Sequence, residues 1–313
     1  MKRKVIQIAK STQLVSLPRA WTKKYNIQKG DELDIEEESN KLIVSTEKNV
    51  ILGTKEVDVT NLDRLTIIFF IRSLYKIGYD EMTITFKNQV CLDLRNNKQV
   101  PVMEVITREV SRLNGVEIFT QKEGYCIIKT ISEDSAKAFD NMLRRIFLLL
   151  EETFRELEEG YNKGDKTILQ GLQRKHDVIT KFISYSERLL NKVGYKEIKK
   201  RDLMFHQLEV LDMIIDILKH SSRYLEKHNF KASPEGLLVY QEITSCFKIF
   251  YDLYYNFDFK RIVSFNRKRY EVLDMFVLHE KKISKKEYYI LSNLYQILEQ
   301  ILNLINTRVV LEF

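Results

Sequence analysis

The sequence predicts a mainly α-helical protein with a small β-rich head. It has only 10 glycines and 3 prolines in 313 residues, and so few helix breakers favour long helices. Strand patterns are confined to the chain before residue 132, after which apolar residues recur at the three- and four-residue spacing of packed helices. The length allows more than one hydrophobic core. We therefore expect a head at 1–50, an α/β middle domain at 51–131 and a helical bundle at 132–313.

The head is expected to contain four strands and one short helix. Apolar or alternating runs of strand length occupy 3–8, 14–17, 32–37 and 41–46, while Pro18 at a favoured first helical position begins a helix over 18–25. About fifty residues of hairpins bury too little surface to be stable alone. Pairing with a second copy of the chain is therefore expected.

The rest of the chain divides into the middle domain and six helices. The middle domain is expected to contain helices at 61–78 and 101–113 and strands at 81–86, 90–94 and within 116–129. The six helices are separated at 160–164, 194–199, 229–234, 257–264 and 281–284. The third and sixth helices are similar around Leu211–Leu218 and Leu294–Ile301, which indicates a degenerate duplication with repeats at 132–228 and 234–313.

Charge is segregated at the N-terminus. Residues 1–30 hold eight Lys or Arg and no acid, whereas residues 31–50 hold seven acids and two lysines. A basic half beside an acidic half indicates a surface that faces a polyanion. A second basic stretch, residues 260–286, is better explained as a solvated helix face.

Several classes of protein are not favoured. Three unpaired cysteines give neither a disulfide framework nor a zinc motif, and no apolar run reaches the length of a membrane span. The N-terminus lacks the apolar segment of a signal peptide. Motifs of nucleotide-binding, hydrolase and metalloprotease sites are absent. We expect a cytoplasmic, non-enzymatic protein without membrane insertion.

The first 48 residues resemble the AbrB/MazE swapped-hairpin domain. The resemblance rests on the stretches from Arg3 to Trp21 and from Tyr25 to Leu33. It implies a homodimer whose interleaved hairpins present basic residues to double-stranded DNA. Arg3, Lys4 and Lys23 match basic positions of the family, whereas Thr22 and the pair Ala9-Lys10 depart from its pattern. The expected DNA-contacting residues are Arg3, Lys4, Lys10, Arg19, Lys23 and Lys24.

The remaining chain resembles the archaeal branch of the PhoU family. Matching stretches are Arg64-Leu65, Gly78–Glu81, Arg112–Ile118, Arg144-Arg145 and Asp177 leading to Arg188–Leu190. The resemblance implies two three-helix units, each with a metal motif on its third helix. Asp212 and Asp216, one turn apart, would hold a divalent metal such as Mg, Mn, Fe or Zn. Further expected ligands are Asp177, Glu271 and Glu299, although Tyr295 replaces a carboxylate in the second motif.

A simpler explanation of each acid is a solvated helix face, and His176 and His206 are better explained as half-buried polar residues than as ligands. Together the resemblances imply a dimeric transcriptional regulator, linked to phosphate homeostasis, whose bundle senses a metal, phosphate state or a partner. One alternative is an adaptor that docks on a phosphate transporter or sensor kinase and uses the head for dimerisation. An antitoxin is the other, although a long folded bundle argues against it.

Overall fold

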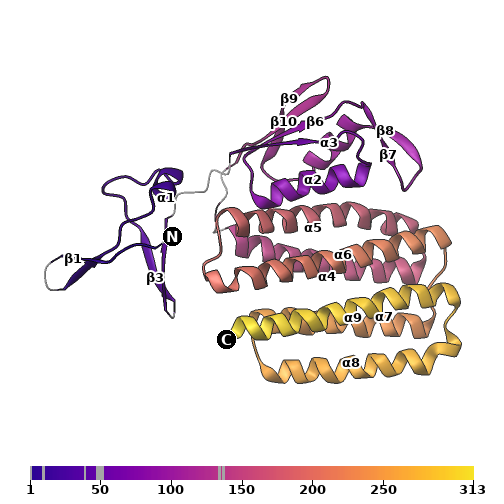
Figure 1. Ribbon diagram of the computed structural model, residues 1–313. Helices are drawn as coiled ribbons and strands as arrows, with labels where there is room; N and C mark the ends of the chain where they lie inside the picture. Colours follow the sequence, from indigo (N-terminus) through magenta and orange to yellow (C-terminus); the bar gives the residue numbers. More distant parts are fainter. Residues whose placement is uncertain (1, 9–10, 39, 47–52, 133–134, 136–137) are drawn as a thin grey trace.

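The protein is described by a computed structural model that covers residues 2–8, 11–38, 40–46, 53–132, 135 and 138–313 (Figure 1). In the head, β1 (Ile6–Ile8) pairs antiparallel with β2 (Thr12–Leu14), and β3 (Asp34–Glu38) pairs antiparallel with β4 (Lys41–Ser45). Helix α1 (Arg19–Lys24) lies between the two hairpins in the sequence. The four strands and the helix predicted for the head are therefore present, but the strands are shorter than expected and the second one lies at Thr12–Leu14 instead of 14–17.

The middle domain is a four-stranded sheet packed against two helices. Its strands follow the order β5-β6-β10-β9, in which β5 and β6 are parallel and the other neighbours are antiparallel. A separate hairpin joins β7 to β8. The elements are β5 (Thr54–Asp58), α2 (Arg64–Ile77), β6 (Glu81–Thr85), β7 (Val90–Asp93), β8 (Lys98–Pro101), α3 (Val102–Val110), β9 (Val116–Lys122) and β10 (Tyr125–Thr130).

Local chemistry explains the boundaries of α2. The Asp63 carboxylate accepts hydrogen bonds from the backbone N–H groups of Leu65 and Thr66, which caps the first turn. Gly78 ends the helix with φ 105°, a left-handed conformation that favours glycine. Strands β5 and β8 were not predicted, because both are short and largely polar and β5 occupies an edge of the sheet.

Six long helices follow, as predicted. They are α4 (Ala138–Lys163), α5 (Lys166–Lys192), α6 (Arg201–His228), α7 (Pro234–Tyr255), α8 (Phe259–His279) and α9 (Lys285–Glu312), with short 3₁₀ turns at Ile198–Lys200 and Glu280–Lys282. Two boundaries were wrong: Gly160 lies inside α4, and α8 begins before Ser264. Gly160 continues the helix because its missing side chain makes room for Leu169 of α5.

The six helices form two similar groups of three. Helices α4, α5 and α6 pack together, α7 packs on α8 and α9, and the two groups meet through α6 with α9 and α4 with α7. Figure 1 shows α5 at one side of this stack and α8 at the opposite side. The outer face of α5 is covered by α2, whereas Val263, Tyr270 and Val277 lie exposed along α8. One hydrophobic core fills the helical stack, and a second fills the middle domain.

Arg188 of α5 joins these two cores. Its side chain is 1% exposed, and its guanidinium donates to the carbonyl oxygens of Tyr75 (3.0 Å) and Tyr79 (3.1 Å) and to Thr130 Oγ1 (3.0 Å). Asn191 donates to the Lys76 carbonyl at 2.9 Å. The Tyr75 carbonyl also accepts from the N–H of the cap residue Gly78 at 3.0 Å, and the last carbonyls of a helix carry the negative end of its dipole. Arg188 and Asn191 therefore cap α2 from the neighbouring helix.

Replacing Arg188 with Met should destabilise the protein by about 3–5 kcal/mol, because buried carbonyls lose their donors and a buried pairing is broken. Urea unfolding followed by circular dichroism measures this loss. The matched control is Arg174→Met on the exposed side of α5, which should change stability by less than about 0.5 kcal/mol. Equal losses in the two variants would contradict a capping role for Arg188.

Candidate functional sites

The predicted DNA-contacting residues lie on the exposed surface of the head. Arg3 and Lys4 precede β1, Arg19 begins α1, and Lys23 and Lys24 form its last turn. All five side chains are exposed, and Lys24 lies over the Tyr25 ring with Nζ 5.5 Å from its centroid. Lys10 falls outside the described residues. The surface of the head thus leaves these cations available to a ligand.

Each hairpin of the head carries an uncovered apolar face. The register pairs Ile6 with Leu14 and Ile8 with Thr12, so these four side chains share one face of the β1–β2 hairpin. Ile6, Ile8 and Leu14 are 56%, 53% and 45% exposed. On the second hairpin, Ile35 and Leu42 share a face and are 65% and 70% exposed. Within the described part of one chain, no buried apolar residue lies in the head.

Three of the five predicted metal ligands lie close together. Asp177 is on α5, and Asp212 and Asp216 are on α6, which packs against α5. His176 connects two of them, because its Nδ1 is 2.9 Å from Asp177 Oδ1 and its Nε2 is 2.8 Å from Asp216 Oδ1. Thr180 donates to Asp212 Oδ1 at 3.1 Å. The sequence therefore predicted this grouping, although it gave His176 no part in it.

Protein cations and donors surround these three acids. Arg112 Nη2 lies 2.8 Å from Asp177 Oδ1, and Lys219 forms an ion pair with Asp216. Burial opposes ionisation of Asp216, but the hydrogen bonds from His176 and Lys219 hold its pKa below the usual value. Burial and the neighbouring Asp216 raise the pKa of Asp212. The oxygens that would bind a metal thus already contact groups of the protein.

The other two predicted ligands lie in the second group of helices. Glu299 of α9 accepts hydrogen bonds from Arg269, with Nη2 at 2.5 Å, and Glu271 is exposed on α8. Figure 1 places α8 on the side of the stack opposite to α5. In the described ranges, no group of three or more His, Cys, Asp or Glu side chains is arranged to hold a metal ion. Convergence of all five acids was wrong, since Glu299 contacts Arg269 and Glu271 is exposed on α8.

Sequence reasoning missed a charged contact where α2 meets α5 and α6. Lys76 Nζ lies 2.8 Å from Glu187 Oε2 and 3.0 Å from Glu209 Oε1. Burial raises the pKa of Glu187 to about 9, with a further contribution from Glu209 and an opposing one from Lys76. The hydrogen bond shared with Glu187 lowers the pKa of Glu209. In the sequence, this contact was indicated only by Glu187, an acid that stands among residues of α5 that the structure shows to be buried.

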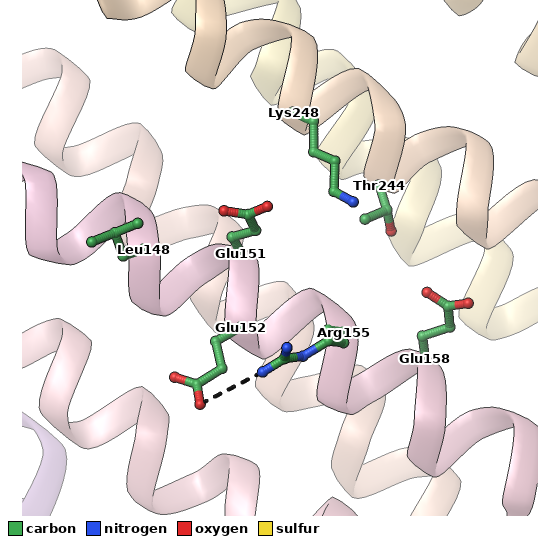
Figure 2. Close-up of a pocket in the computed structure, with 7 residues that line it drawn as sticks. All are labelled: Leu148, Glu151, Glu152, Arg155, Glu158, Thr244 and Lys248. Atoms are coloured by element: carbon green, nitrogen blue, oxygen red, sulfur yellow. Dashed lines mark ion pairs between the residues drawn. The ribbon is translucent and has the colours of Figure 1, made fainter.

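A groove lies on the surface between α4 and α7. Its volume is about 450 Å³, and Figure 2 shows Glu151, Glu152 and Glu158 of α4 around it with Lys248 of α7 opposite. The single dashed contact joins Arg155 to Glu152 at 3.9 Å. Glu158 accepts a hydrogen bond from Gln241 at 2.7 Å. The groove is open and of mixed charge, and its geometry indicates no particular ligand.

Comparison with known proteins identifies a relative of the head. Residues 6–51, which include β1 to β4, match the family described as antidote-toxin recognition MazE, bacterial antitoxin. No curated protein and no solved structure matches the chain. The head is thus similar to MazE-type domains, as expected from the sequence, and such a domain is typical of DNA-binding or antitoxin-type regulators. The PhoU resemblance of the remaining chain stays a prediction.

The described helices were also compared with the requirements of a membrane span. None of them combines sufficient length with sufficient apolar character to cross a bilayer.

Stability should depend on pH through Glu187. Its pKa is about 9 in the folded protein and 4.5 in its ordinary state, so the folded chain retains a proton that the unfolded chain releases. This contribution is complete below pH 4.5 and is lost as the pH rises towards 9. Glu187→Gln should therefore gain stability relative to wild type between pH 5 and pH 8, by at most about 1.4 kcal/mol per pH unit. Urea unfolding at several pH values measures this trend.

Glu209→Gln serves as the control, because its change in stability at neutral pH should have the opposite sign. Its lowered pKa means that ionised Glu209 stabilises the fold above its ordinary pKa, and that this benefit is lost at acid pH. The variant should be less stable than wild type at neutral pH and approach it in acid. If the free energy of unfolding depended on pH in the same way for wild type and Glu187→Gln, Glu187 would be ionised in the folded protein.

Proposed function

We propose that this chain is a non-enzymatic transcriptional regulator that binds double-stranded DNA as a homodimer through its head. The observation that carries the proposal is the combination of uncovered apolar hairpin faces with exposed surface cations in one small domain. The similarity of residues 6–51 to the MazE family supports the same reading. Helical and middle domains then act as the part of the regulator that receives a signal.

Dimerisation follows from the surface of the head. Five large apolar side chains on two hairpins are between 45% and 70% exposed, and burial of each would contribute roughly 1.5–3 kcal/mol. A two-stranded hairpin is at best marginally stable alone. A second copy offers the same apolar faces, so a two-fold pairing covers both sets and completes a core that one chain lacks.

DNA is the ligand that best fits the charge of this domain. The eight Lys or Arg of residues 1–30 face no acid within that stretch, and a two-fold dimer doubles their number. Clustered cations bind phosphates and release counterions, whereas base contacts would supply sequence preference. The acids of β3 keep the basic surface to one part of the domain.

The sensing role of the bundle is proposed from the grouping of its helices. Two groups of three helices agree with the duplication expected from the PhoU resemblance, and a link to phosphate homeostasis is implied by that resemblance alone. We do not include a bound metal in the proposal, because Arg112, Thr180 and Lys219 already contact the three grouped acids.

Charge reversal of Arg3, Lys4 and Lys23 to Glu should abolish binding to a duplex from the region upstream of the protein's own coding sequence. Repulsion from phosphates replaces attraction at three positions in each chain. Fluorescence anisotropy over a range of salt concentrations measures binding, and wild type should lose affinity steeply with salt.

A control variant with Lys122, Lys166 and Lys227 changed to Glu alters the net charge equally on exposed positions outside the head. It should bind nearly as wild type. If both variants keep wild-type affinity, or if wild type binds no duplex, the head would serve only for dimerisation and the adaptor alternative would be preferred.

Leu14→Asp should convert the dimer into monomers. In a dimer core this carboxylate would be buried without a partner, which costs several kcal/mol. Light scattering after gel filtration measures the mass, and circular dichroism should show unchanged helix content. Phe119→Asp, at an exposed apolar position of β9, should leave the mass unchanged. A dimeric Leu14→Asp variant would place the main interface outside the β1–β2 face.

A further inference from the structure

A second hollow lies between α5 and α6, on the side that faces the β7–β8 turn of the middle domain. Its volume is about 170 Å³, which is enough for one small anion with water. Lys219 and Arg223, one helical turn apart on α6, reach into it together with Gln173 of α5. Its remaining polar walls are Gln170, Ser222 and Glu226.

Cations from two parts of the chain converge at this hollow. Gln173 accepts a hydrogen bond from Arg223 and donates one to Asp177, which is paired with Arg112 after α3. The positive charge of Arg95, in the β7–β8 turn, also acts on Arg223. Burial lowers the pKa of Arg223, and the charges of Arg95 and Arg112 lower it further. The pKa of the neighbouring His220 is lowered by burial, then by Lys219, Arg223 and Arg95. Such like charges repel one another across the boundary between middle domain and bundle.

The nearby acids neutralise only part of this charge. Arg112 is paired with Asp177 at 2.8 Å and Lys219 with Asp216, while Glu226 accepts a hydrogen bond from Gln170 at 2.8 Å. Arg223 donates only to the neutral Gln173. In the part of the chain that the structure describes, neither Arg95, His220 nor Arg223 forms an ion pair with a carboxylate. The Nε of Arg112, on the neighbouring middle domain, is buried without a hydrogen-bond partner among the described residues.

We propose that this hollow binds a phosphate-like oxyanion, held by Arg95, Lys219 and Arg223. Guanidinium groups donate two parallel hydrogen bonds to such anions, and a lysine adds a compact charge. The anion would replace cation repulsion with attraction to both the β7–β8 turn and α6. It would therefore strengthen the contact between middle domain and bundle. The inference does not depend on DNA binding by the head.

Thermal unfolding of the full chain with inorganic phosphate, against sodium chloride of equal ionic strength, tests the site. Phosphate should raise the melting temperature of wild type, because a ligand that binds the folded state stabilises it. Arg223→Gln and Arg95→Gln should each weaken binding by about tenfold or more, measured by calorimetry. Arg108→Gln, an equal charge loss on an exposed position of α3, should bind as wild type.

A second measurement separates binding from folding. Without phosphate, Arg223→Gln should melt at or above the wild-type temperature, because one repelling cation has been removed. Arg95 lies on an exposed turn, so its variant reports on binding even if Arg223→Gln folds poorly. A nucleoside diphosphate is the parallel probe. If the nucleoside diphosphate stabilises wild type but inorganic phosphate does not, and both arginine variants lose this stabilisation, the site binds the phosphoryl group of a larger ligand.

Two results would overturn the proposal. One is a wild-type melting temperature that neither probe raises beyond the chloride control. The other is stabilisation that persists undiminished in both Arg95→Gln and Arg223→Gln, since the anion would then bind elsewhere.

Discussion

The capping of α2 by Arg188 is the contact on which the arrangement of the middle domain and bundle depends. A guanidinium removed from water must have its donors satisfied, and here the partners are carbonyl oxygens at the end of a helix whose dipole favours a cation. Both requirements are met only in one relative position of α2 and α5. Lys192, which lies 2.6 Å from Asp80, reinforces that position. Two separate hydrophobic cores are thereby held as one unit.

The same boundary gathers several buried or partly buried ionisable groups of the protein. Asp177, Asp216 and Glu187 lie on the helices that Arg188 holds against the middle domain, and Arg112 and Lys76 reach them from that domain. Burial strengthens each of these interactions because water screens them less. A signal that changes the charge here would act on the contact between the domains. The proposed anion site lies at the same boundary, where Arg95 and Arg223 meet.

The head differs from the rest of the chain because none of its described apolar side chains is buried. Its hairpins expose Ile6, Ile35 and Leu42, and in the proposed dimer a second chain would cover these apolar side chains. Basic residues collect before Gly30 and acids after it, which orients the positive surface without any long-range contact. In the proposed regulator, dimer formation would be coupled to DNA binding, because the paired state would bury the apolar faces and double the number of cations.

The sequence by itself determined the long helices and the head, because helix period, turn residues and charge segregation are local properties. The spacing of Asp212 and Asp216 correctly placed them on one face of α6. Only the tertiary structure decided what surrounds them: Arg112 and Asp177 are 65 residues apart, and Lys76 and Glu209 are 133 apart. It also decided that Glu299 contacts Arg269 instead of the other acids. Such partners are chosen by packing of distant segments, which no local pattern specifies.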